Sequence, residues 1–316
     1  MSVYTSVSED ELSTWLGHYS VGSLVSCEPI KAGIENSNYF ITTSQGRYVL
    51  TLFERLPAEE LPFYVNLMAH LARHGIPCPA PIADLSDQYL QRLNGKPAAL
   101  VTRLAGQSVE RPGRPECAEL GALLARMHLA ARSYAAYLEN PRGPRWWRFA
   151  ARECSSFLDV QKRSLLENEL AFQAAHRFPD LPRGPVHADL FRDNALFESG
   201  RICGVVDFYF AGVDTFLYDV AVCVNDWCLR DPSRKLELDA SRTGALLGAY
   251  HAVRPFGAAE REAWPIMLRA AALRFWLSRL YDFHLPRPGV MVHAHDPEHF
   301  REILELRAGG DAAWME

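Results

Sequence analysis

The character of the chain changes near residue 106, and this change limits the folds that the chain can adopt. Before this point, short strand-like runs alternate with turns, and after it amphipathic helical patterns predominate. The first strand-like runs cover residues 23–30, 37–44 and 46–54, and Ser44-Gln45-Gly46 predicts a hairpin between the last two. We therefore predict an α+β protein with a small antiparallel β-rich lobe over residues 1–105 and a larger, mostly helical lobe over residues 106–316.

Two helices are predicted within the β-rich lobe. Residues 8–19 begin with Ser8, and Glu11 follows three residues later, which is typical of a capping box. Residues 58–73 carry apolar residues at helical spacing, and the prolines of HGIPCPAPI end this helix. The stretch 106–115 is rich in proline and glycine and predicts a linker between the lobes.

Composition excludes several classes of protein. The chain has 316 residues, 48% of them hydrophobic, and a formal net charge of −5, without the basic excess of a nucleic-acid-binding protein. Its 7 cysteines form no CxxC pair, so we predict reduced thiols in a cytoplasmic protein rather than disulfides or a zinc ribbon. No apolar run approaches the roughly 18 residues of a membrane span, and the N-terminus has no signal-peptide pattern.

The stretch VHADLFRDNALF, followed by GRICGVVDFYF, concentrates polar residues among apolar ones. The strand-like runs ALF and ICGVV are separated by the turn ESGR, so they predict a hairpin. Asn194 precedes the first run and Asp207 follows the second, so the hairpin brings both to the edge that carries Asp189. Two carboxylates and an amide oxygen suit Mg²⁺. Zinc is disfavoured because His187 is the only soft ligand nearby.

HADLFRDN with the later VVDF matches the H-x-D-x-x-x-x-N … I-D pattern of the aminoglycoside phosphotransferase-like small-molecule kinases, which are relatives of protein kinases. The chain resembles this superfamily, and the resemblance implies a two-lobed protein-kinase-like fold that uses ATP and Mg²⁺. It implies that Asp189 orients the attacking hydroxyl or accepts its proton, and that Asn194 and Asp207 hold Mg²⁺.

The same resemblance implies structural roles for three further residues. VDTFLYDVAV matches the D-x-x-x-x-D-L-A continuation of the superfamily and contributes Asp214 and Asp219. Asp219 lies in an apolar helix start, so we predict a capping or loop-bracing aspartate. His187 lies between two apolar residues, and we predict a buried histidine that braces the loop.

The β-rich lobe resembles the nucleotide-binding lobe of these kinases and differs from it once. The third strand usually reads V-x-K, but here YVLTLFE places Thr51 at the lysine position. Lys31 is our candidate for the missing cation, although a solvated lysine at a strand end fits the sequence equally well. AGIENSNYF resembles the phosphate-covering loop, and ALVTRLAG resembles the hinge that binds adenine through its backbone. The other predicted nucleotide-binding residues are Gly33, Asn36, Ser37, Asn38, Thr51, Thr102 and Leu104.

Over residues 1–308 the chain most resembles the homoserine kinases of this superfamily, through GIENSNYF, YVLTLFE, AEELPFY, DFYFAG, CVNDWC and LRFWLSRLYDFHLPRPG. The resemblance implies transfer of phosphate from ATP to L-homoserine, a step of threonine biosynthesis. Such a site needs partners for an ammonium and for a carboxylate. We predict Asp226 and Trp227 for the ammonium, and Arg274, Arg279 or Tyr281 for the carboxylate.

Two alternatives remain open at the level of sequence. A kinase of the same fold could act on choline, ethanolamine, an aminoglycoside or a methylthioribose. Because Thr51 replaces the usual lysine, the chain could also be a non-catalytic nucleotide-binding module. The presence of Asp189, Asn194 and Asp207 argues against this alternative. The expected partners are ATP and a small amino acid, without nucleic acid or membrane, and the sequence does not determine the oligomeric state.

Overall fold

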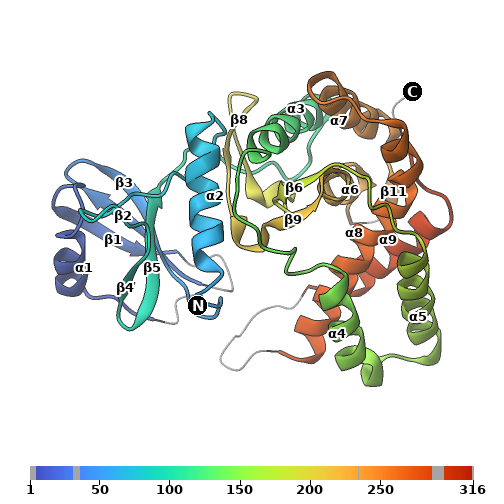
Figure 1. Ribbon diagram of the computed structural model, residues 1–316, viewed down its shortest axis with the longest axis horizontal. Coiled ribbons are helices and arrows are strands. Elements are labelled where there is room, and N and C mark those ends of the chain that lie inside the picture. The colour runs from blue at the N-terminus through green and yellow to red at the C-terminus, as the bar shows by residue number, and fades with distance from the viewer. Residues whose placement is uncertain (1–4, 31–35, 234, 287–294, 315–316) are drawn as a thin grey trace. The chain divides into compact units, whose positions relative to one another are not determined.

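The structure is a computed structural model that describes residues 5–30, 36–233, 235–286 and 295–314 (Figure 1). The described residues divide into two compact units, with the boundary between Ala105 and Gly106. We call them the N-terminal unit and the C-terminal unit. The first is rich in β-structure and the second is mostly helical, so the predicted α+β class is confirmed.

The N-terminal unit is built on one antiparallel sheet with the strand order β1-β2-β3-β5-β4. The predicted hairpin joins β2 to β3, where Thr43 pairs with Gly46. Helix α1 packs on one face of the sheet through Leu12, Trp15 and Leu16. The elements are α1 (Glu9–Leu16), β1 (Leu24–Pro29), β2 (Ser37–Thr43), β3 (Gly46–Leu52), α2 (Leu61–Arg73), β4 (Gln91–Leu93) and β5 (Lys96–Thr102).

Helix α1 ends at Leu16, three residues before its predicted end, and two other helix boundaries differ from prediction where proline is involved. The capping box of Ser8 and Glu11 is present at α1. Helix α2 begins three residues later than predicted, at Leu61, and α3 of the other unit begins two residues earlier, inside the predicted linker. Each has a proline in its first turn, the only part of a helix where the missing amide costs no hydrogen bond.

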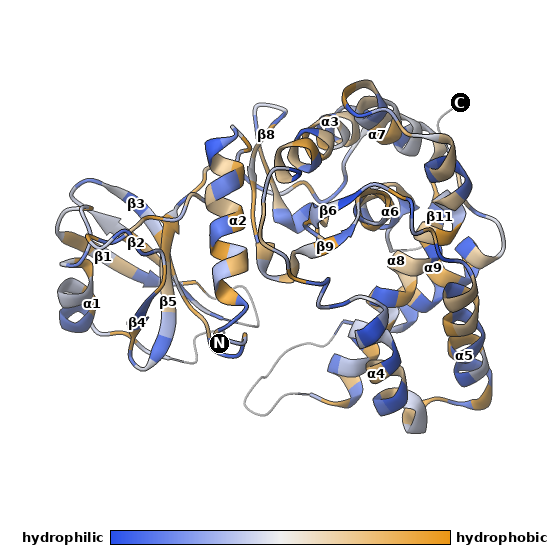
Figure 2. Ribbon diagram, viewed as in Figure 1, coloured by the Kyte–Doolittle hydropathy of each residue, from blue (hydrophilic) through white to orange (hydrophobic). Residues whose placement is uncertain are grey.

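The C-terminal unit surrounds one buried helix, α6, which is seen end-on in Figures 1 and 2. Every residue of α6 is buried, including the polar Asp219, Asn225 and Asp226. In the described part of this unit, the β-structure consists of three two-stranded pairs: β6 with β9, β7 with β8, and β10 with β11. The elements are α3 (Arg114–Ala131), α4 (Pro144–Cys154), α5 (Val160–Ala175), β6 (Arg183–Val186), β7 (Ala195–Glu198), β8 (Arg201–Val205), β9 (Gly212–Thr215), α6 (Phe216–Trp227), β10 (Leu229–Asp231), β11 (Lys235–Leu238), α7 (Ala240–Val253), α8 (Ala258–His284) and α9 (Glu298–Ala308).

All seven cysteines are free thiols, and five of them are buried. No helix among the described residues is both long enough and apolar enough to cross a membrane.

Glycine at position 121 allows α3 and α7 to pack closely. A Cβ atom at Gly121 would lie 2.1 Å from the carbonyl oxygen of Leu246, whereas a Cβ at Gly244 of α7 would meet nothing within 4 Å. We expect Gly121→Ala to lower the free energy of unfolding by about 1–3 kcal/mol, because backbone must move. Gly244→Ala should raise it by up to about 1 kcal/mol. Chemical denaturation measures both, and equal effects of the two variants would contradict the prediction.

Candidate active site

The hairpin of β7 and β8 brings Asn194 and Asp207 together. Ala195 pairs with Val205 at the end of the hairpin, and the Val206 amide donates to the Asn194 carbonyl oxygen at 3.0 Å, which extends the pairing by one residue. The ends of the two strands therefore meet, as the spacing of the two motifs predicted.

His187 links the loop of Asp189 to the strand that leads to Asp207. Its side chain is buried, its Nε2 lies 2.9 Å from the Val206 carbonyl oxygen, and its Nδ1 accepts the Asp189 amide at 3.3 Å. Because Nδ1 accepts, the ring hydrogen is on Nε2 and is donated to Val206. Burial lowers the pKa of His187, in agreement with a neutral ring.

Asp219, in the first turn of α6, stabilises the same loop through hydrogen bonds to its backbone. Its carboxylate accepts the amides of His187 at 2.9 Å and Ala188 at 2.7 Å, and His128 Nε2 at 3.0 Å. Burial alone would raise the pKa of Asp219, but the hydrogen bonds from His128 and from the His187 amide, together with the electrostatic influence of both histidines, outweigh it and lower the pKa. Ala188 has a left-handed backbone (φ +61°), a strained conformation that these two amide bonds hold in place.

Asp214 is also tied into the structure near the start of α6. It accepts the side-chain amide of Asn140 at 2.8 Å and the backbone amide of Thr215 at 2.7 Å. Burial raises the pKa of Asp214, and these hydrogen bonds only partly offset the effect. These contacts hold β9 to the segment that precedes α4.

The carboxylate of Asp189 is paired with Arg274 of α8, at 3.3 Å between Oδ1 and Nη2. Arg274 is only 3% exposed, and its guanidinium lies 3.7 Å from the ring centroid of Phe275. The sequence predicted Arg274 as a partner for a substrate carboxylate. The structure instead places it against Asp189, where it orients the predicted catalytic carboxylate.

Asp226 and Trp227, at the end of α6, hold the segment that follows Asp189, which we call the predicted catalytic loop. Asp226 accepts the backbone amide, Nε and Nη2 of Arg192 at 2.9, 3.0 and 3.1 Å. Burial raises the pKa of Asp226, and the charge of Arg192 opposes the rise. Trp227 is fully buried and donates its indole N–H to the Leu190 carbonyl oxygen at 3.0 Å. Both residues have loop partners in place of the predicted substrate ammonium, so we remove them from the proposed substrate site.

The oxygen atoms near Asp189 fit a hard cation. Asn194 donates its side-chain N–H to the Asp189 carbonyl oxygen at 2.8 Å, so its amide oxygen receives no hydrogen bond from the described residues. Asp207 is exposed, with a left-handed backbone (φ +65°) at the start of the short 3₁₀-helix Phe208–Phe210. Within the described ranges, no three His, Cys, Asp or Glu side chains form a group that could hold a metal. An amide oxygen and one or two carboxylates are a donor set that suits Mg²⁺ rather than zinc.

The predicted phosphate-covering loop is described only in part. Lys31 and Gly33 lie outside the described residues. Asn36 is buried, and its side-chain oxygen has no hydrogen-bond partner among the described residues. Ser37 is fully buried and donates to the Glu54 carboxylate at 2.7 Å. This hydrogen bond, made within the N-terminal unit, occupies the Ser37 hydroxyl, and a contact of Ser37 with a phosphate stays a prediction.

The position of the missing lysine is occupied by a neutral pair. Thr51 is 2% exposed and donates its hydroxyl to Asn38 Oδ1 at 2.8 Å, across β2 and β3. At the predicted hinge, Thr102 is bonded to Ala80 through both its amide and its hydroxyl oxygen, each at 2.9 Å. The Leu104 amide donates to no acceptor in the described part of the chain. Leu104 is therefore the better candidate for a backbone contact with adenine.

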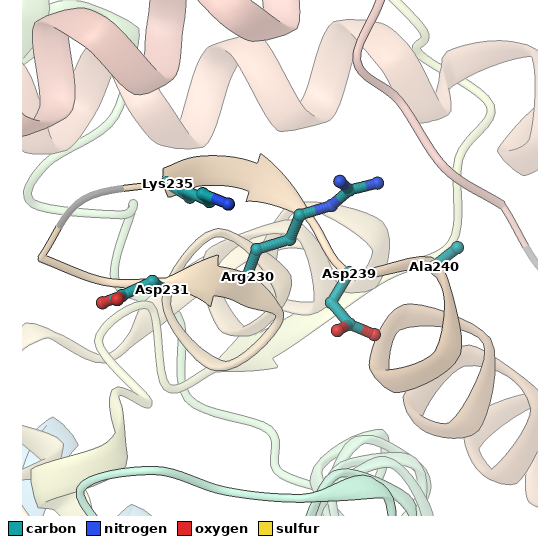
Figure 3. Close-up of a pocket in the computed structure, with 5 residues that line it drawn as sticks. All are labelled: Arg230, Asp231, Lys235, Asp239 and Ala240. Atoms are coloured by element: carbon teal, nitrogen blue, oxygen red, sulfur yellow. The ribbon is translucent and has the colours of Figure 1, made fainter.

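Tyr281, predicted as a substrate contact, packs against Trp146 and Phe149 of α4, with ring centroids 6.3 and 6.0 Å away. A surface hollow beside β10, β11 and the start of α7 contains none of the predicted site residues (Figure 3). Asp239, one of the residues that line the hollow, caps α7 by accepting the Arg242 backbone amide at 2.9 Å. The residues that line the hollow are Arg230, Asp231, Lys235, Asp239 and Ala240.

Comparison with known proteins agrees with this geometry. Residues 26–256 match the phosphotransferase enzyme family. A homoserine kinase of Burkholderia mallei is 52% identical over 319 residues, with 97% of this chain and 96% of that protein covered. An amicoumacin kinase in complex with AMP-PNP and Ca²⁺ has a TM-score of 0.73 at 14% identity, covering 98% of this chain and 96% of its own. A spectinomycin phosphotransferase in complex with ADP and spectinomycin has a TM-score of 0.67 at 13% identity, and the match covers 96% of this chain and 98% of that protein. These structures confirm the predicted kinase-like fold.

Proposed function

The chain belongs to the phosphotransferase enzyme family, and from this premise we propose that it transfers the γ-phosphoryl group of ATP to the hydroxyl of L-homoserine. The products are ADP and O-phospho-L-homoserine. The observation that carries the proposal is the 52% identity to a homoserine kinase over nearly the full length of both chains. The arrangement of Asp189, Asn194 and Asp207 supports the type of reaction.

Phosphoryl transfer depends on alignment of the nucleophile and on neutralisation of phosphate charge. The substrate hydroxyl oxygen forms a bond to the γ-phosphorus while the bond from that phosphorus to the bridging oxygen of ADP breaks. Asp189 orients the hydroxyl and accepts its proton, and Arg274 holds the Asp189 carboxylate in position. Asn194 and Asp207 would hold Mg²⁺, which supplies positive charge to the phosphate oxygens when it is bound.

The nucleotide is proposed to contact the N-terminal unit through the Leu104 backbone. The Thr51–Asn38 pair carries no positive charge, so another residue must supply the cation that a strand lysine supplies in related kinases. Lys31, outside the described residues, remains the proposed replacement on the basis of the sequence.

A panel of acceptors tests the proposal directly. The enzyme is incubated with Mg²⁺, ATP and, in separate reactions, L-homoserine, choline, ethanolamine, 5-methylthioribose or kanamycin. ADP release is measured, and the product is identified by phosphorus NMR. We expect kcat/KM for homoserine to exceed every other value by about 100-fold or more, because a site built for a zwitterion rejects compounds that leave its charged groups unpaired. A better acceptor in the panel would contradict the substrate, and absence of ADP release with all five would favour a non-catalytic module.

A further inference from the structure

Helix α8 carries a second arginine near the predicted catalytic loop, Arg279, five positions after Arg274. Arg279 is half-buried, and its guanidinium lies 4.5 Å from the ring centroid of Phe300. Among the described residues, no carboxylate lies within ion-pair distance of Arg279, whereas Arg274 is paired with Asp189. Arg274 and Arg279 therefore differ, because only Arg274 has an ion-pair partner among the described residues.

The acidic groups that interact electrostatically with Arg279 have other hydrogen-bond or ion-pair partners. Asp189, Asp226 and Asp296 all lie within electrostatic range of it. Asp189 is paired with Arg274, and Asp226 is paired with Arg192. Asp296 is exposed and accepts the backbone amide of Glu298 at 2.9 Å, at the start of α9.

Arg279 is a partly desolvated cation, and the described residues supply no counter-ion to it. Burial lowers the pKa of Arg279 to about 10, and the charge of Arg274 contributes to the decrease. The same surroundings lower the pKa of His299 to about 4, mainly through burial and then through Arg279. Burial and Arg279 also lower the pKa of His295. Both histidines are thus neutral near pH 7. The positive charge of Arg279 remains, and an anion bound beside it would stabilise that charge.

The chemistry of the proposed substrate separates the roles of the two arginines. In homoserine the hydroxyl and the α-carboxylate lie at opposite ends of the molecule. The hydroxyl must reach Asp189, so a carboxylate bound to Arg274 would lie beside the negative charge of Asp189. Arg279 lies further along the same helix, where a carboxylate would meet an unpaired guanidinium.

We propose that Arg279 binds the α-carboxylate of the amino-acid substrate and selects homoserine over an amino alcohol of the same length. This inference rests on the proposed function. A guanidinium offers two parallel N–H donors to a carboxylate, and contact with the Phe300 ring limits the orientation of that plane. Arg274 is a positioning residue for Asp189 and does not contribute this specificity.

The test compares L-homoserine with 3-amino-1-propanol, which is homoserine with hydrogen in place of the carboxylate. Arg279→Gln should lower kcat/KM for homoserine on the order of 100-fold, mostly through KM, because the carboxylate loses a charged partner. The same variant should leave kcat/KM for 3-amino-1-propanol within about threefold of the unmodified enzyme. Arg279→Lys keeps the charge without the paired donors and should give an intermediate value for homoserine alone.

Arg269→Gln is the matched control, because Arg269 lies on the same helix and is paired with the buried Glu169. It should lower the melting temperature without changing the ratio of kcat/KM for the two substrates. The inference would be overturned, and the proposed function left intact, by equal decreases of kcat/KM for both substrates in Arg279→Gln. An unchanged KM for homoserine in Arg279→Gln and in Arg279→Lys would have the same meaning. If the unmodified enzyme phosphorylates no homoserine, the proposed function fails and the inference fails with it.

Discussion

We expect Asp189→Asn to lower kcat for homoserine phosphorylation by about 10³-fold, because the substrate hydroxyl loses the group that orients it and accepts its proton. Asparagine has nearly the same shape as aspartate but cannot accept that proton. Steady-state ADP release at saturating ATP and homoserine measures the effect. Affinity for ATP, measured by calorimetry, should be nearly unchanged.

Stability needs a separate control, because Asp189→Asn also leaves the buried Arg274 without its counter-ion. The double variant Asp189→Asn/Arg274→Met removes both charges and should regain part of the lost melting temperature, but not the activity. Glu198→Gln, at the turn end of the same hairpin, should alter neither quantity. If Asp189→Asn retained more than about a tenth of kcat, the catalytic role of Asp189 would be wrong.

Asp207→Asn should lower activity by about 10³-fold at millimolar Mg²⁺ and raise the Mg²⁺ concentration that gives half-maximal rate, because one anionic ligand of the cation is lost. Asparagine is the suitable replacement, since Asp207 has a left-handed backbone that asparagine adopts more readily than most residues. Initial rates over a Mg²⁺ titration measure the effect, and calorimetry of ATP binding with and without Mg²⁺ gives a readout that does not depend on turnover.

Asp214→Asn provides the comparison for Asp207→Asn. Asp214 accepts hydrogen bonds from Asn140 and Thr215, so its replacement should lower the melting temperature while the Mg²⁺ dependence stays the same. If Asp207→Asn left the half-maximal Mg²⁺ concentration unchanged, the proposed metal site would need another ligand.

Several features of the fold could be predicted because they depend on neighbours in the chain. The hairpin of β7 and β8 follows from two short apolar runs and a turn, and its register places Asn194 beside the segment that leads to Asp207. The capping box at α1 depends on Ser8 and Glu11, three residues apart. Proline was harder to interpret, because the same residue that ends a helix also fits its first turn.

The partners of the buried charges could not be predicted in this way. Asp226 accepts hydrogen bonds from Arg192, which is 34 residues away in the chain. Arg274 of α8 pairs with Asp189 of the predicted catalytic loop, although the sequence favoured a substrate carboxylate for Arg274. An arginine that binds a ligand and an arginine that pairs with an internal aspartate are identical in sequence, because only the packed neighbours distinguish them.

The α+β class and the phosphotransferase family could be predicted from the sequence, because short-range periodicity and motif spacing carry that information, and the structure and the family match confirm both. The roles of Asp189, Asn194 and Asp207 remain predictions from the same motifs. Which charged groups are already paired depends on the tertiary fold. It committed Asp226 to Arg192 and Arg274 to Asp189, and it left Arg279 without an ion-pair partner among the described residues. A buried charge is stabilised by whatever the fold brings into contact with it, and those contacts join segments that are distant in the chain.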